Sequence, residues 1–255
     1  MDFFTILFLI GGGIICAIVN VIGGGGSLIA LPILLALGLP AGVANGTNRI
    51  AILFQDSTSL FAFQRKKVIP WHEGLRIAVP VIAGAVLGAL TAARFLDEIL
   101  MNICVLVLVV FMIVALFYQP GKWLNTSGIS TRYRMTPSDF VIFLATGFYG
   151  GFIQAGFTYL VMATLVLRVG NSVVQSDSVK ILLNILITPF ALIIFAFHHQ
   201  VDWMYGLFMG IGGGIGGILG TRFATHWKPR FTRTVLIILL VISGLYILLF
   251  RIFHV

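Results

Sequence analysis

The sequence has little charge and few polar stretches. Only 9% of its 255 residues are charged, whereas 59% are hydrophobic, and the mean hydropathy is +1.09. Soluble domains carry about 25% charged residues, so this chain lacks the polar surface that a soluble globular protein needs. The composition therefore argues against a soluble protein and predicts an all-α, multi-pass protein of the lipid bilayer.

Cysteine is equally scarce, which bears on metals and cofactors. Cys16 and Cys104 are isolated inside apolar segments, so they form neither a disulfide framework nor a metal-ligand cluster. We expect no metal and no cofactor. No basic residue precedes the first apolar run, MDFFTILF, which predicts a first transmembrane helix in place of a cleaved signal peptide.

Apolar segments occupy nearly the whole chain. Most of them approach the ~20 residues that a membrane-spanning helix needs, but the second and the seventh are shorter. The segments cover residues 3–22, 27–37, 48–63, 75–93, 99–118, 138–153, 157–167, 178–197, 204–221 and 234–253.

The chain repeats itself at a spacing of 132 positions. The repeated residues are a tryptophan and two glycines: Trp71, Gly84 and Gly88 in the first half, and Trp203, Gly216 and Gly220 in the second. We predict two transmembrane repeats of five segments each, at 1–118 and 138–255, joined by the hydrophilic connector 119–137. An odd number of crossings in each repeat would invert the second copy relative to the first.

The basic residues support this inversion. The net charge of +8 follows the positive-inside rule in a membrane protein, so we expect no nucleic-acid partner. In the inverted topology, the loops of the chain fall on two sides of the membrane. With Arg49 and Lys180 set apart as buried candidates, twelve of the remaining basic residues fall on the side of the connector, here the first side, and only Arg94 and Arg251 fall on the opposite side. We therefore expect the first side to face the cytoplasm, and both termini to lie outside the plasma membrane. The basic residues of the first side are Arg65, Lys66, Lys67, Arg76, Lys122, Arg132, Arg134, Arg168, Arg222, Lys228, Arg230 and Arg233.

A glycine run interrupts the first repeat, in the stretch VIGGGGSLIALP. Irregular backbone inside a membrane is stable only where protein covers it or where it lines a wet cavity. Inverted repeats with such broken helices are typical of secondary transporters, whose substrates bind between the repeats. The N–H groups of Gly24, Gly25, Gly26 and Ser27, at the start of a helix, would suit an anion. A tight turn at the membrane surface, or close helix packing, explains the glycines equally well.

Ionisable residues within apolar segments are functional candidates. Arg49 and Lys180 take nearly matching places in the two repeats and would flank a central cavity that attracts an anion. Alternatively, Arg49 pairs with a carboxylate and Lys180 extends to the cytoplasmic surface. Asp56 and Asp177 are candidates for carrying protons as the coupling ion, or are partners for nearby cations. Gln154 is either a substrate contact or the donor of an interhelical hydrogen bond.

Three stretches resemble the sulfite exporter (TauE/SafE) family. They are GGGGSLIALPILLALGLPAGVANGTNRIAILF, GFYGGFIQAGF and SVKILLNILITPFALIIFAFHHQVDW, which together with their spacing extend the likeness over most of the chain. The resemblance implies transport of a small inorganic or organic sulfur anion, such as sulfite, thiosulfate or sulfoacetate, driven by an ion gradient. It makes these residues candidate substrate contacts: Gly23–Ser27, Asn45, Thr47, Asn48, Gln154, Gly156 and Lys180. The carboxylate of Asp177 departs from the family pattern, which has a small uncharged residue or Asn there.

Two other classes stay open from the sequence. An anion channel would share the composition and the repeats. An intramembrane enzyme would use Ser27 in its glycine-rich setting as a nucleophile, but no histidine lies deep in a predicted helix to act as its base.

Overall fold

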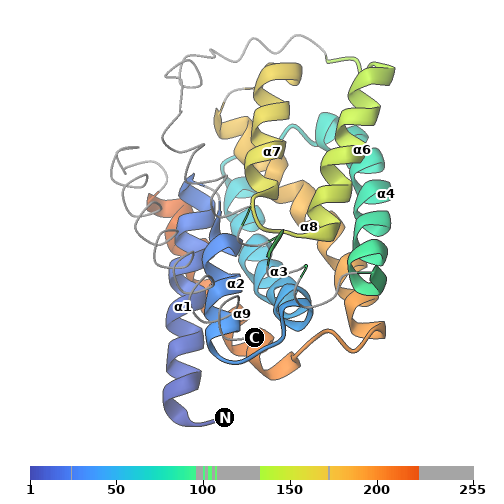
Figure 1. Cartoon of the computed structure of the whole chain (residues 1–255). Coiled ribbons are helices and arrows are strands. Elements are labelled where there is room, and N and C mark those ends of the chain that lie inside the picture. Colours follow the sequence, from blue (N-terminus) through green and yellow to red (C-terminus); the bar gives the residue numbers. More distant parts are fainter. Residues whose placement is uncertain are drawn as a thin grey trace.

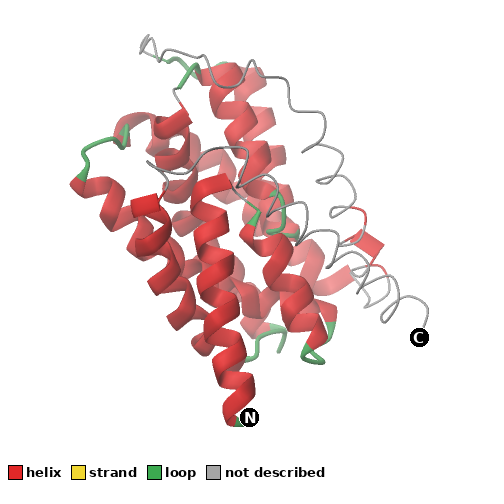
Figure 2. Ribbon diagram, turned by 90° about the vertical axis from the view of Figure 1, so that its left-hand side faces the viewer, coloured by secondary structure: helices red, strands yellow, loops and turns green. Residues whose placement is uncertain are grey.

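The structure is a computed structural model that describes residues 1–23, 25–95, 100, 103–104, 107, 133–171 and 173–223. Within these residues all regular structure is helical, as the composition predicts (Figures 1 and 2). The helices are α1 (Phe3–Gly23), α2 (Gly26–Ala36), α3 (Ala41–Arg65), α4 (Trp71–Phe95), α6 (Pro137–Phe152), α7 (Phe157–Thr164) with a π-helical turn (Leu165–Val169), α8 (Val173–Phe197) and α9 (Trp203–Phe223).

Four of these helices contain stretches long and apolar enough to cross a membrane: Phe3–Val21, Trp71–Phe95, Gln175–Phe197 and Trp203–Arg222. The chain is therefore a multi-pass membrane protein. Helix α3 begins at Ala41, seven residues before the predicted segment 48–63. The prediction missed these residues because they include polar side chains, which lower the hydropathy but do not interrupt the helix. The predicted segment 234–253, nearly all of 99–118 and most of the connector 119–137 lie outside the described residues.

Two helical hairpins contain the breaks that the glycines predict. Helix α2 has 11 residues and α7 has 8, so neither can cross a membrane alone, and each packs on the helix before it. Both begin at a glycine in the left-handed region, Gly25 with φ 89° and Gly156 with φ 79°. Because other residues are strained in that conformation, glycine allows the chain to reverse there.

Helices of each half of the chain pack on helices of the other half. Helix α1 packs on α9, and α6 packs on α4 in the same way. These contacts are close because glycines face backbone: a Cβ atom on Gly84 would lie 2.0 Å from the Leu144 oxygen, and one on Gly216 would lie 2.4 Å from the Ile14 oxygen. Gly84 and Gly216 are matching positions of the sequence repeat, so the packing is compatible with two inverted repeats.

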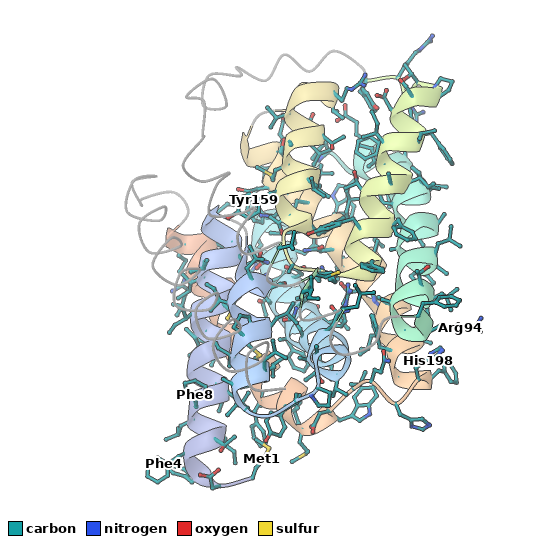
Figure 3. The ribbon with its side chains drawn as sticks, viewed as in Figure 1. Met1, Phe4, Phe8, Arg94, Tyr159 and His198 are labelled. Atoms are coloured by element: carbon teal, nitrogen blue, oxygen red, sulfur yellow. The ribbon has the colours of Figure 1, made fainter. Side chains whose placement is uncertain are left out.

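The long helices run side by side, and the loops that join them lie at two ends of the molecule, whereas the turn before α7 lies inside the bundle (Figures 1 and 2). Met1, Arg94 and His198 lie at one end, here called the N-terminal end (Figure 3). The ends of α3 and α9 and the start of α8 meet at the other end, where Lys66 Nζ donates to the Thr221 oxygen over 3.2 Å and Ser178 Oγ donates to the Val68 oxygen over 3.3 Å. Most described basic residues outside the core belong to this basic end: Arg65, Lys66, Lys67, Arg76, Arg134, Arg168 and Arg222.

Apolar side chains cover the outside of the bundle, as the bilayer requires. Phe4 and Phe8 project from the outer side of α1 (Figure 3), and Phe197 is 80% exposed. The interior, in contrast, holds a set of fully buried polar side chains, mostly on α3 and α8. Since a membrane protein buries such groups at a cost, they are the first candidates for a functional site.

Candidate functional site

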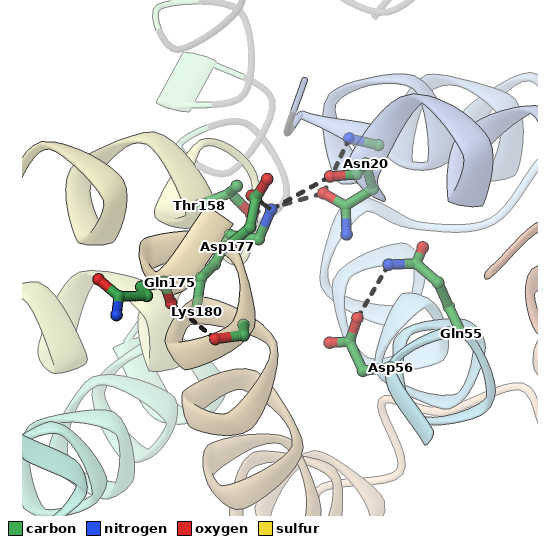
Figure 4. A network of polar contacts seen from close by, with 9 residues as sticks. Asn20, Gln55, Asp56, Thr158, Gln175, Asp177 and Lys180 are labelled. Carbon is green, nitrogen blue, oxygen red and sulfur yellow. Dashed lines mark hydrogen bonds and ion pairs between the residues drawn. The ribbon is translucent and has the colours of Figure 1, made fainter. Parts of the chain in front are cut away.

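The tips of the two hairpins meet inside the bundle. Asn20, in the last turn of α1, accepts hydrogen bonds at its side-chain oxygen from the N–H of Gly26 over 3.3 Å and from the hydroxyl of Thr158 over 3.4 Å. Figure 4 shows Asn20 between the two hairpins, with Thr158 and Lys180 beside it. The break in each half of the chain is therefore joined to the break in the other half.

A small cavity of about 10 Å³ lies beside this junction, between α1, α2, α3 and α9. Three predicted substrate contacts, Gly26, Ser27 and Asn48, line it. In the described part of the chain, the buried Nδ2 atom of Asn48 has no hydrogen-bond partner. A buried amide donor without a partner is costly, and a ligand or water in the cavity would satisfy it.

The polarity of the cavity suits an anion. Helix α2 begins at Gly26, so its positive end lies at the cavity wall, where the N–H of Gly26 itself donates to Asn20. Gln55 adds a second amide to the lining. The cavity has room for about one water molecule, so it would have to widen to admit a larger anion.

Arg49 is fully buried and binds the end of α6. Its guanidinium donates to the carbonyl oxygens of Gly150 and Gly151, each over 2.8 Å, and to the side-chain oxygen of Gln154. It also lies over the Phe195 ring, 5.4 Å from the centroid. The carboxylate partner considered from the sequence is therefore wrong: carbonyl groups at a helix C-terminus, which carry partial negative charge, compensate Arg49.

Asn45 supports the same helix end. Its Nδ2 atom donates to the Phe152 oxygen over 2.9 Å, so Asn45 and Arg49 together satisfy three carbonyl groups in the last turn of α6. Both residues were expected to contact substrate. In this conformation the protein itself uses these donor groups.

Lys180 has the corresponding role on α8. Its Nζ atom lies 2.7 Å from Asp177 Oδ1 and 3.4 Å from the backbone oxygen of Asn20, in the last turn of α1. The residue is only 1% exposed. The alternative in which Lys180 extends to the cytoplasmic surface is therefore wrong, and its charge stays inside the bundle (Figure 4).

Hydrogen-bonded side chains extend from Arg49 to Asn184 on α8, the helix that carries Lys180. Gln154, which accepts from Arg49, donates from Nε2 to Asn184 Oδ1 over 2.9 Å, the interhelical hydrogen bond considered from the sequence. Asp56 is also fully buried in this interior. Gln55 donates to Asp56 Oδ1 over 2.9 Å, while Oδ2 has no partner among the described residues.

The remaining predicted residues lie apart from the cavity or serve the turns. Gly25 and Gly156 precede α2 and α7, and Gly24 lies outside the described residues. Thr47 accepts the N–H of Asp202 at the N-terminal end, over 2.8 Å. Sequence reasoning missed Asn20 and Thr158, although each is a lone polar residue within a few positions of a glycine break.

Other chemistries find little support in the described residues. No group of three or more His, Cys, Asp or Glu side chains is placed there to hold a metal ion. The histidines of the described ranges, His72, His198 and His199, lie at the ends of helices, away from Ser27.

Comparison with known proteins decides the family. The sequence profile of the family described as "Sulfite exporter TauE/SafE" matches residues 8–247, nearly the whole chain. The chain belongs to this family. It is thus a membrane transporter of the TauE/SafE type, as the resemblance of its glycine motifs predicts.

Curated relatives of this TauE/SafE protein are themselves named as transporters. The probable membrane transporter protein ORF9 of Sinorhizobium sp. is 29% identical, over 93% of this chain and 90% of its own length. The probable membrane transporter protein of Haemophilus influenzae is 24% identical over 94% and 92%, and YfcA of Escherichia coli K12 is 23% identical over 91% and 85%. No solved structure matches the chain.

Proposed function

We propose that this TauE/SafE protein is a secondary-active transporter of a small sulfur-containing anion such as sulfite, thiosulfate or an organosulfonate. The site is the cavity between α1, α2, α3 and α9, beside the meeting point of the hairpins. The observation that carries this proposal is the buried, unpartnered amide of Asn48, which lines the cavity at the start of α2. An oxyanion accepts hydrogen bonds at every oxygen, so it suits a lining of N–H donors.

The coupling ion in this proposal is the proton. Asp56 is fully buried, accepts a hydrogen bond from Gln55 and has one carboxylate oxygen without a partner among the described residues. Asp177 pairs with Lys180 and is 19% exposed at its side chain, so it links the buried carboxylate to the basic end. Intramembrane carboxylates beside a cation are suited to carrying protons in transporters.

The orientation in the plasma membrane follows from the charge at the two ends. The described basic residues cluster at the end that holds the start of α4, α6 and α8. We propose that this basic end faces the cytoplasm and that both termini lie outside. Alternating access would then expose the cavity to each end in turn.

Uptake of labelled sulfite into proteoliposomes tests the proposal. We expect saturable uptake that unlabelled thiosulfate or sulfoacetate inhibits more strongly than chloride does, and that a pH gradient accelerates. Folded protein with no saturable uptake of any sulfur anion would contradict the proposed substrate class. Ohmic anion currents much larger than the turnover of a transporter allows would show that the protein is a channel and not a carrier.

A further inference from the structure

Arg49 and Lys180 hold the two hairpins from opposite halves of the chain. Arg49 lies in the first half and binds the carbonyl groups of Gly150 and Gly151 at the end of α6, in the second half. Lys180 lies in the second half and binds the carbonyl group of Asn20 at the end of α1, in the first half. The two contacts correspond under the sequence repeat, since Arg49 and Lys180 occupy nearly matching positions of it.

From this exchange we infer that Arg49 and Lys180 are paired latches: positioning residues that close the transport path at its two ends. Neither is a ligand of the transported anion in the closed state. Each cation contacts the partial negative charge at the C-terminus of a helix in the other half, and Lys180 also pairs with Asp177 on its own helix over 2.7 Å. Such charge-assisted contacts are strong and also reversible. The inference rests on the proposed function, because a path must exist for the latches to close it.

The two latches lie toward different ends of the molecule. Arg49 is about two turns inside α3, counted from its start at Ala41 near the N-terminal end. Lys180 is about two turns inside α8, counted from its start near the basic end. Release of Arg49 would therefore open the path toward the N-terminal end, and release of Lys180 would open it toward the basic end.

Each latch is also connected to the wall of the cavity. Arg49 directly follows Asn48, which lines the cavity. Lys180 binds the backbone oxygen of Asn20, whose side-chain oxygen accepts the N–H of Gly26, another lining residue. An anion that binds Asn48 in this cavity thus lies one residue from Arg49 and beside Gly26, which is bonded to the residue that Lys180 binds. Both contacts are formed in this structure, in which the cavity holds only about one water molecule.

Cys16 provides a reporter that needs no substrate. It lines the same cavity, is 5% exposed, and becomes the only cysteine after Cys104→Ala. We would measure its reaction with a membrane-impermeant methanethiosulfonate, applied to either face of sealed vesicles. The latch variants are Arg49→Gln and Lys180→Gln.

We expect each latch variant to raise the labelling rate of Cys16 about tenfold or more from one face, because a lost charge-assisted hydrogen bond shifts an equilibrium by at least that factor. The faces should be opposite: the N-terminal end for Arg49→Gln and the basic end for Lys180→Gln. Exposed matched controls at those ends, Arg94→Gln and Lys67→Gln, should label at the wild-type rate.

Wild-type labelling in both latch variants, or increases from the same face in both, would overturn the inference. If Arg49→Gln does not reach the membrane, Asn45→Ala takes its place, because it removes only one donor to the same end of α6. It should give a smaller increase in Cys16 labelling from the N-terminal end, and no increase from that end would also overturn the inference. One-sided labelling without sulfite uptake would support the latches and reject the proposed substrate. Sulfite uptake with unchanged labelling in both latch variants would support the proposed substrate and reject the latches.

Discussion

The hydroxyl of Thr158, at the start of α7, donates to the side-chain oxygen of Asn20, near the end of α1, over 3.4 Å. The two residues are 138 positions apart, and the contact joins the tips of two hairpins that each contain a glycine-broken turn. The same oxygen also accepts the first N–H of α2. Asn20 therefore fixes the start of α2 relative to the other half of the chain.

Replacing Asn20 with alanine should weaken both stability and substrate binding. The N–H of Gly26 would lose its buried acceptor, which costs about 1–3 kcal/mol. We expect a lower unfolding temperature in detergent and weaker binding of labelled sulfite. Thr158→Val is the matched control, because it removes one donor and leaves the Gly26 contact in place. An Asn20→Ala variant that binds sulfite like the wild type would contradict this role.

Gly25→Ala should abolish transport, whereas Gly38→Ala should not. Both glycines have a positive φ, 89° and 91°, so alanine costs roughly 1–2 kcal/mol at either position. Only at Gly25 would the added Cβ also meet another side chain, the hydroxyl of Tyr159 at 3.0 Å, in the other hairpin. Uptake assays on matched amounts of folded protein would show whether the loss is specific to the tip.

Asn48→Ala and Thr47→Val should separate binding from stability. The Asn48 amide donates to no described residue, so its removal should leave the unfolding temperature near the wild-type value and raise the Kd for sulfite about tenfold. Thr47 accepts the Asp202 N–H, so Thr47→Val should lower the unfolding temperature and leave the Kd unchanged. A Kd for Asn48→Ala equal to that of the wild type would move the anion site elsewhere.

Asp56→Asn should uncouple transport from the pH gradient. The substitution removes the proton-carrying group and keeps the shape of the side chain, so exchange of labelled for unlabelled sulfite should persist. Acceleration of net uptake by an inward pH gradient should be lost. Asp139→Asn, in the first turn of α6 and away from the cavity, is the control. Undiminished acceleration in Asp56→Asn would assign coupling to another group, with Asp177 the next to test.

The four long apolar helices were predictable from the sequence because hydrophobic length alone specifies a membrane helix. The breaks at Gly25 and Gly156 were predictable for a related reason, since glycine runs inside apolar segments mark irregular backbone. Boundaries failed where polarity and helix disagree, as in α3, which is helical from Ala41 even though its first turns contain Asn45, Asn48 and Arg49.

The candidate site was predictable only in part. Gly26, Ser27 and Asn48 were expected to act together, and they line one cavity. The partners of Arg49 were missed because they are backbone carbonyl groups. Every residue has one, so the sequence shows that a buried charge needs compensation but not which carbonyl groups provide it. Asn20 was missed because a single amide in an apolar run has no pattern of its own.

The exchange of helices between the halves has a consequence for how the protein is made. In the first half alone, the face of α1 that packs on α9 would be uncovered. In the second half alone, the face of α6 that packs on α4 would be uncovered. We therefore expect that neither half folds alone: each should be degraded when expressed by itself and rescued when both are co-expressed. By the same geometry, a chain with only one such half would be complete only as a dimer of two oppositely inserted copies.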